Sequence, residues 1–262
     1  GAALATAIAC IAGGPRALVY FRKYADTLKI HPLKWSVTSL LLTLRNTGYM
    51  ARIGFATFLT ELTMSMMMLT GNYMFISMLS EDGVAAFAIT CYLFPVVFSI
   101  SNAVTEAAQP IISFNYGAHR QERVSRTLRL SLFTAIICGL LVTLCLLIGT
   151  TGVVSLFLNP DEKAYHLAVE GLPLFALCPI FFAVNITFIG YYQSIERAMA
   201  STVYTLLRGV LFLVPCFIIL PRIIGVSGLW LAIPTAELLT CIVIYTRCTF
   251  KHTMITDTRV NM

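Results

Sequence analysis

Long apolar stretches fill most of the chain, and polar residues gather in the connections between them. The apolar segments are residues 1–20, 53–79, 84–114, 127–158, 165–193, 202–220 and 226–245. A helix needs about 20 apolar residues to cross a bilayer. The runs are continuous rather than alternating with a period of two, which favours helices over membrane-barrel strands. The pattern therefore predicts an all-α polytopic membrane protein, with a truncated start to its first helix.

Basic residues follow a second pattern along the chain. All but three of the 18 Lys and Arg residues lie at every second connection or in the tail; the exceptions are Lys163, Arg208 and Arg222. Cytoplasmic connections carry an excess of Lys and Arg. We therefore expect a multi-pass protein of the cell inner (plasma) membrane, with a cytoplasmic C-terminus and a cytoplasmic connection at 22–52. Residues 35–45 of that connection predict an amphipathic helix on the membrane surface, with or without a role in joining two halves.

Composition agrees with a membrane protein and excludes other classes. Hydrophobic residues make up 58% of the chain and charged residues 11%, whereas soluble domains carry roughly 25% charge. The formal net charge of +6 belongs to the connections and forms no basic domain, so no nucleic-acid partner is expected. The eight cysteines lie within or at the ends of apolar segments and form no CxxC pair, which predicts neither a metal site nor disulfides.

One stretch is specific enough to indicate a family. Residues 102–118 read NAVTEAAQPIISFNYGA, which resembles the AxQPxxSxNYGA pattern of the multidrug and toxic compound extrusion (MATE) family. The basic run at 120–129, the GYYQS at 190–194, the LLRG at 206–209 and the Val214-Pro215 pair resemble the same family. The resemblance covers essentially the whole chain.

The resemblance implies one six-helix lobe of a twelve-helix, two-lobe transporter plus the preceding helix. Residues 1–21 would be the last helix of the N-lobe, 22–52 the cytoplasmic inter-lobe linker, 53–250 the C-lobe and 251–262 a cytoplasmic tail. Family members exchange H⁺ or Na⁺ for bulky, often cationic, organic compounds, with no other cofactor. This chain would then be the C-terminal half of such an antiporter, and its partners would be the bilayer, the small-molecule substrates and the missing N-terminal lobe.

Four ionisable residues lie inside apolar segments: Glu61, Glu106, Arg208 and Glu237. A charge at the bilayer centre costs about 2.5–3.5 kcal/mol on insertion scales, so each one suggests a function. The helical rise places all four at a similar depth, roughly 9–12 Å from the cytoplasmic ends of their helices. We therefore predict that Arg208 pairs with one of the three glutamates. Another glutamate would remain available to protons or to a cationic substrate.

Glu61 is the strongest candidate for cation coupling or substrate binding. It lies in the sequence TFLTELT at 57–63, at a position that resembles an acidic residue in the seventh helix of some family members. A desolvated carboxyl favours its protonated form and could carry a proton. The alternative is a structural glutamate that is hydrogen-bonded to neighbouring helices.

The segment of this chain that corresponds to the tenth helix of the family differs from the family pattern. Some members place an aspartate of an ion site in that helix, whereas Asn185 is the strongest oxygen donor in the core of the corresponding segment of this chain. This difference argues against Na⁺ coordination by this half and directs attention to an acid in the missing lobe. Asn185 stays a candidate for cation coupling or substrate binding.

Other side chains are predicted to line a substrate cavity. Met64, Met68 and Phe58 give their segment the soft, adaptable character that suits promiscuous binding, although ordinary helix packing would explain them too. Gln109 of the family-like stretch is the fourth candidate for the lining.

Two alternatives to a drug exporter remain, a flippase and a scaffold, and an enzyme is the third class considered. A lipid-linked oligosaccharide flippase of the same superfamily would line its cavity with several cations, whereas only Arg208 qualifies here. An enzyme is not expected, because no HExxH, GxSxG or paired-aspartate motif is present. A non-transporting membrane scaffold would leave the buried charges without a purpose.

Overall fold

The structure is a computed structural model that describes residues 2–24 and 36–260, with most side chains as far as Arg247. The middle of the predicted linker, residues 25–35, and the side chains of the predicted tail lie outside this description. The chain divides into two compact units, Gly1–Met50 and Ala51–Met262. In the described residues every regular element is a helix, which confirms the predicted all-α fold.

The first helix of the chain, α1, spans Ala2–Lys23 and ends with the basic residues Arg22 and Lys23. It corresponds to the predicted segment 1–20 and extends slightly further. Positive side chains in the last turn of a helix interact favourably with its dipole.

The longest element, α2 (Val37–Gly117), is a hairpin of two helices rather than one rod. A straight helix of its 81 residues would measure about 120 Å, several times the thickness of a bilayer core. Ser80 has non-helical backbone angles, φ 57° and ψ −149°, and the chain reverses there. The rings of Phe75 and Phe87 stack across the hairpin with centroids 4.6 Å apart. The legs 37–79 and 81–117 therefore contain the predicted segments 53–79 and 84–114.

The helix that contains the predicted apolar segment 53–79 extends further toward the N-terminus than that segment. The helix begins at Val37 and continues without a break through the residues that the sequence suggested as a separate surface helix. Nothing between 37 and 53 interrupts the helical hydrogen bonds, because the segment contains no proline and Gly48 is tolerated inside a helix.

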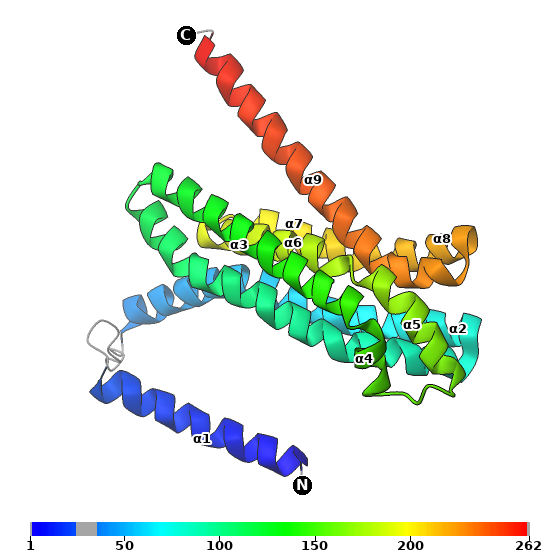
Figure 1. The fold of residues 1–262 in the computed structure, drawn as a ribbon. Coiled ribbons are helices and arrows are strands. Elements are labelled where there is room, and N and C mark those ends of the chain that lie inside the picture. The colour runs from blue at the N-terminus through cyan, green and yellow to red at the C-terminus, as the bar shows by residue number, and fades with distance from the viewer. Residues whose placement is uncertain (1, 25–35, 261–262) are drawn as a thin grey trace. The chain divides into compact units, whose positions relative to one another are not determined.

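The remaining predicted segments are all helical, and most of them are broken. The elements are α3 (Gln121–Ile148), α4 (Thr150–Ser155), α5 (Lys163–Phe175), α6 (Cys178–Ser194), α7 (Ala198–Leu206), the π-helical turn η1 (Leu207–Leu211), α8 (Leu213–Ile224) and α9 (Val226–Val260) (Figure 1).

Length and apolar character qualify these helices to cross a membrane. In the described residues four helical runs pass this test: α2, α3, Ala198–Ile224 and Val226–Arg247. The α5–α6 pair, bent by 46°, adds a fifth. Pro173 and Pro179 flank that bend, in agreement with the expected effect of proline inside a membrane helix.

Lipid rather than water suits the outer surface of the bundle. Helix α3 exposes Leu130, Phe133 and Leu141 at 64%, 62% and 56% of their surfaces. Such a continuous apolar face would be a liability in water but is expected against acyl chains. An aromatic core holds the inside together, with the Phe75 ring edge-on to Trp230 at 5.0 Å and Phe94 edge-on to Phe182 at 5.1 Å.

The alternate connections meet at one end of the Ala51–Met262 unit. Arg52, Arg197 and Arg247 line one cavity there, and Ile53, Gly117 and Glu196 line a neighbouring one. We call this end, at which Arg52, Arg197 and Arg247 lie, the basic end. The predicted alternation of basic and non-basic connections therefore has a geometric counterpart. The side of the membrane that the basic end faces stays a prediction.

The hairpin between α8 and α9 depends on a glycine. A Cβ added to Gly228 would overlap the backbone carbonyl group of Leu220, which cannot rotate away as a side chain could. We expect Gly228→Ala to lower the free energy of unfolding in detergent micelles by about 1–3 kcal/mol, the usual cost of overpacking. Gly152→Ala in α4 is the matched control, because a Cβ there meets nothing within 4 Å. Equal stability of the two variants would contradict this account of the hairpin.

Candidate functional site

A polar cleft opens near the basic end, between both legs of α2 and the end of α6. Its outer part has a volume of ≈ 470 Å³ and its inner part ≈ 50 Å³. The two parts share Thr57, Asn102, Gln109 and Gln193, so we treat them as one polar cleft. Glu106 and Ser113 line the outer part, and Thr60 and Glu61 line the inner part.

Two of the family-like motifs meet in this cleft. Gln109 donates a hydrogen bond from Nε2 to Oε1 of Gln193 at 3.1 Å, and Ser113 donates to the backbone oxygen of Ser194 at 3.3 Å. Gly190 lies against Thr105, where an added Cβ would overlap the threonine methyl group. The QPxxS and GYYQS sequences, which the sequence shows only as separate motifs, therefore form one helix contact.

A chain of amides extends this contact to a third helix. Gln193 donates from Nε2 to the hydroxyl oxygen of Thr57 at 3.2 Å. The first leg of α2, its second leg and α6 are thus joined through Thr57, Gln193 and Gln109. Amide and hydroxyl groups of this kind supply both donors and acceptors to a bound polar molecule.

Three carboxylates line the polar cleft: Glu61 in its inner part, and Glu106 and Glu196 in its outer part. Glu61 has no hydrogen-bond or ion-pair partner among the described residues. Glu106 accepts a hydrogen bond at 2.7 Å from the side-chain amide of Asn102, one helical turn away. No Lys or Arg lines either part of the cleft, so the charge of its described lining is negative.

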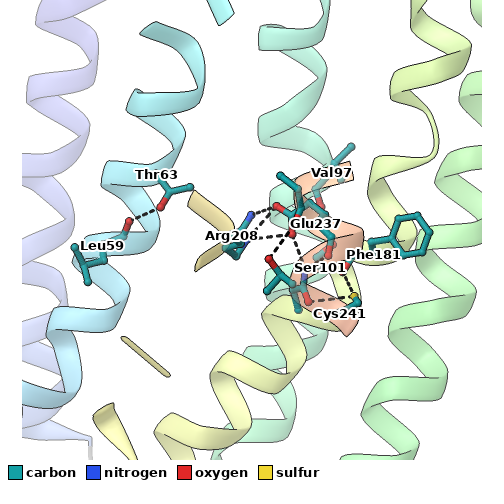
Figure 2. Close-up of polar contacts among 11 residues, drawn as sticks. Leu59, Thr63, Val97, Ser101, Phe181, Arg208, Glu237 and Cys241 are labelled. Atoms are coloured by element: carbon teal, nitrogen blue, oxygen red, sulfur yellow. Dashed lines mark hydrogen bonds and ion pairs between the residues drawn. The ribbon is translucent and has the colours of Figure 1, made fainter. Parts of the chain in front are cut away.

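The third membrane glutamate is buried against Arg208. Arg208 Nη2 lies 2.7 Å from Glu237 Oε1, and Arg208 Nε donates to both carboxylate oxygens at 3.0 and 3.2 Å. The two side chains are 2% and 5% exposed. The Arg208 guanidinium also lies 4.4 Å from the centre of the Phe182 ring, within range of a cation–π contact. The predicted pairing of Arg208 with a glutamate is confirmed, and its partner is Glu237 (Figure 2).

Asn185 and Cys241 complete this buried cluster. The Asn185 amide donates to Glu237 Oε2 at 2.7 Å and to the Glu237 backbone oxygen at 2.9 Å. Cys241 donates from Sγ to Asn185 Oδ1 at 3.1 Å. We call Asn185, Arg208, Glu237 and Cys241 the Arg208 network. Its members form hydrogen bonds with one another, as polar groups in a low-dielectric interior must to remain stable.

The π-helical turn η1 positions Arg208 in this network. The wider turn replaces the α-helical pattern at Leu207–Leu211, and such turns often occur at functional sites. The neighbouring Gly209 lies directly against Thr63, because an added Cβ would overlap the threonine hydroxyl. The third family-like motif, LLRG, therefore brings an arginine into the interior and allows close approach to α2.

Of the other predicted site residues, one lines the polar cleft and the rest lie elsewhere. Gln109 lines the polar cleft. Met64 and Met68 are partly buried and pack against the main apolar core, and neither lines the described cleft. Phe58 is 59% exposed and stacks on Phe55. Asn185 lies in the Arg208 network instead of the cleft. In the described part of the chain, no group of three His, Cys, Asp or Glu residues could hold a metal ion.

Several residues of the cleft were not predicted, among them Thr57, Asn102 and Gln193. A sequence signal for one of them exists, because Asn102, Glu106 and Gln109 are spaced at i, i+4 and i+7 and so share one helix face. Thr57 and Gln193 lie near the basic ends of their apolar segments, and no sequence pattern links them to that face.

Comparison with known proteins identifies relatives of the chain. The family model MatE matches residues 56–218. The FAD transporter of Shewanella oneidensis is 30% identical over 168 residues, which cover 64% of this chain and 37% of that protein.

Solved structures share the fold. An outward-facing multidrug resistance MATE family transporter of the MOP superfamily superposes with a TM-score of 0.84 at 18% identity, covering 98% of this chain and 56% of the other. A MOP superfamily transporter from Pyrococcus furiosus gives a TM-score of 0.82 at 18% identity, with coverages of 95% and 56%. The chain thus spans about half the length of these transporters. From the family match and the shared fold, the chain is a multi-pass membrane protein that belongs to the MatE family.

Proposed function

We propose that this chain forms the C-terminal half of a cation-coupled antiporter that exports bulky organic, often cationic, compounds in exchange for H⁺ or Na⁺. The observation that carries the proposal is the charge of the polar cleft. Glu61 and Glu106 line the cleft, and no cationic side chain does. The positive charge of Arg208 is neutralised by its ion pair with Glu237.

The chemistry of the cleft suits exchange. A carboxylate in a cleft that no cationic side chain lines attracts a cation. The same group can hold a proton or an organic cation but not both at once. Binding of one therefore promotes release of the other, which is the basic requirement of antiport. Glu61 is our candidate for this exchange and Glu106, held by Asn102, for substrate binding.

The membrane orientation belongs to the same proposal. The basic end carries the arginines that the positive-inside rule assigns to the cytoplasm, so the C-terminus would be cytoplasmic in the inner membrane. The chain would act together with an N-terminal lobe that completes the central cavity.

A second substrate class has support from one relative. The 30% identical protein of Shewanella oneidensis is named for FAD, a compound with aromatic rings and phosphates. The amides of Gln109 and Gln193 could bind polar groups of such a molecule, although Glu61 and Glu106 would repel its phosphates. Export of an oligosaccharide lipid or a purely structural role would leave the two carboxylates without a use.

Efflux by the complete two-lobed protein tests the proposal. We expect cells or proteoliposomes that contain it to expel a fluorescent organic cation when either an H⁺ or a Na⁺ gradient is imposed, with the gradients varied separately. FAD efflux measured in the same preparation distinguishes the second substrate class. The absence of gradient-dependent efflux of any organic cation would overturn the exporter proposal.

Glu61→Gln tests the role of the free carboxylate. We expect gradient-driven efflux to fall at least about tenfold, a typical effect of removing a group that transfers protons. The fold should persist, because Glu61 contacts no partner among the described residues. Glu122→Gln, an exposed change in the first turn of α3, is the matched control. Efflux by Glu61→Gln at the wild-type rate would exclude Glu61 as the exchanging group.

A further inference from the structure

A second cavity at the basic end has the opposite charge to the polar cleft. It has a volume of ≈ 380 Å³, and three arginines from separate parts of the chain line it. Arg52 comes from α2, Arg197 immediately precedes α7 and Arg247 lies in α9. Glu196 is the single acidic residue of its described lining, so the arginines outnumber the acids by three to one. We call it the arginine cavity.

None of the three arginines forms an ion pair with a described residue. In the described part of the chain the ion pair with N–O contact within 4.0 Å is Arg208–Glu237, which involves none of them. Like charges that converge on one cavity repel each other unless an anion lies between them. Arginine is also the side chain best shaped to hold phosphate, because its planar fork of N–H groups donates two parallel hydrogen bonds. The arginine cavity therefore fits a phosphate-bearing anion.

The depth of the cavity indicates where that anion resides. Arg197 directly precedes the candidate membrane span Ala198–Ile224, and Arg247 is the last residue of the span Val226–Arg247. Arg52 directly precedes the apolar segment that begins at Ile53. All three arginines thus lie at the boundary between hydrocarbon and water, at the level of lipid headgroups.

The wall of the cavity is apolar on the side of α7. Met199 and Val203 lie one helical turn apart and are 64% and 40% exposed. They belong to a membrane-spanning run, so their exposed surfaces would meet acyl chains. A soluble phosphate compound has no apolar chain to pack against such a wall. A phospholipid, in contrast, has a phosphate and acyl chains in this arrangement.

We propose that the arginine cavity binds the phosphate of an anionic phospholipid, with the acyl chain of the lipid along Met199 and Val203. The site is separate from the polar cleft and shares only Glu196 with it. Basic pockets between membrane helices are a recognised way to hold anionic headgroups. The proposal does not depend on what the protein transports.

Lipid retention by the complete protein tests this site. The purified protein is placed in nanodiscs of phosphatidylcholine that contain increasing amounts of phosphatidylglycerol, and bound lipid is counted by native mass spectrometry after release. We expect selective retention of phosphatidylglycerol. Each of Arg52→Gln, Arg197→Gln and Arg247→Gln should weaken it about fivefold, since one basic residue at an anionic surface contributes about that factor. The triple variant should lose it almost completely.

Matched variants and competitors sharpen the test. Arg126→Gln, an exposed arginine of α3 outside the cavity, should retain the lipid within about twofold of wild type, and Arg→Lys at the three sites should restore part of it. Gel filtration and helical circular dichroism establish that each variant is folded. Wild-type retention by the folded triple variant would overturn the proposal. So would equal retention of phosphatidylcholine, or displacement of the lipid by millimolar glycerol phosphate or inorganic phosphate.

Discussion

Replacing Glu237 with alanine is expected to destabilise the protein by about 3–5 kcal/mol, the usual cost of removing one partner from a buried ion pair. The change leaves the Arg208 guanidinium 2% exposed and without a counter-charge. It also removes the acceptor of the Asn185 amide, whose bond to Glu237 Oε2 measures 2.7 Å. The loss should appear as reduced yield in the membrane and as a lower unfolding midpoint in detergent micelles.

The double variant Arg208→Met, Glu237→Leu separates charge from packing. Replacing both partners by apolar residues of similar volume avoids an unpaired charge, so this variant should recover most of the stability lost by Glu237→Ala. Glu122→Ala, in the exposed first turn of α3, should change stability by no more than about 0.5 kcal/mol. If Glu237→Ala unfolds at the wild-type midpoint, the pair contributes nothing to the fold and Glu237 is held for another reason.

The Arg208 network also shows what depth along a helix can and cannot predict. Counting residues from the helix ends placed Glu61, Glu106, Arg208 and Glu237 at one level, and Arg208 does pair with a glutamate of that level. The depth of a residue in the membrane fixes only its position along the axis of its helix. The choice among the three glutamates depends on how each helix is rotated about its axis, and a sequence without a helix-packing arrangement does not contain that information.

Helix existence was predictable, and the bend between α5 and α6 follows from its flanking prolines, whereas other helix boundaries and the turn η1 were not predictable. The apolar runs anticipated every described membrane segment, because a bilayer requires long apolar stretches. The continuity of the surface helix predicted at 35–45 with the apolar segment at 53–79 was not anticipated, because residues 37–53 are more polar than the segment that follows them. The turn η1 was missed because Leu207–Leu211 has the composition of an ordinary helix.

The lining of the polar cleft was predictable only in part. Glu61, Glu106 and Gln109 were identified because charged and amide side chains stand out in apolar segments, and all three line the cleft. The methionines Met64 and Met68 share their helix with Glu61 but pack against the apolar core. Residue type alone did not distinguish a cavity wall from ordinary packing.

Trp230→Ala is expected to be as damaging as the loss of Glu237, at about 3–5 kcal/mol. Trp230 is 4% exposed, and its ring lies edge-on to Phe75 at 5.0 Å. Within a bilayer, packing rather than escape from water drives helices together, so the lost contacts and the cavity left behind account for the cost. Phe133→Ala, at a side chain that is 62% exposed, is the matched control and should change the unfolding midpoint little.

The partner of Trp230 makes this prediction specific. Gly171 lies against the indole, and a Cβ at this position would overlap the ring. Gly171→Val alone should therefore destabilise the protein by about 1–3 kcal/mol, because the indole must leave its contact with Phe75. In the Trp230→Ala background the space is empty, and the same valine should cost little or even fill the cavity. The coupling energy between the two sites, measured by a double-mutant cycle of unfolding free energies, should be at least about 1 kcal/mol. Additive effects would mean that Gly171 is required by the backbone of α5 rather than by the ring of Trp230.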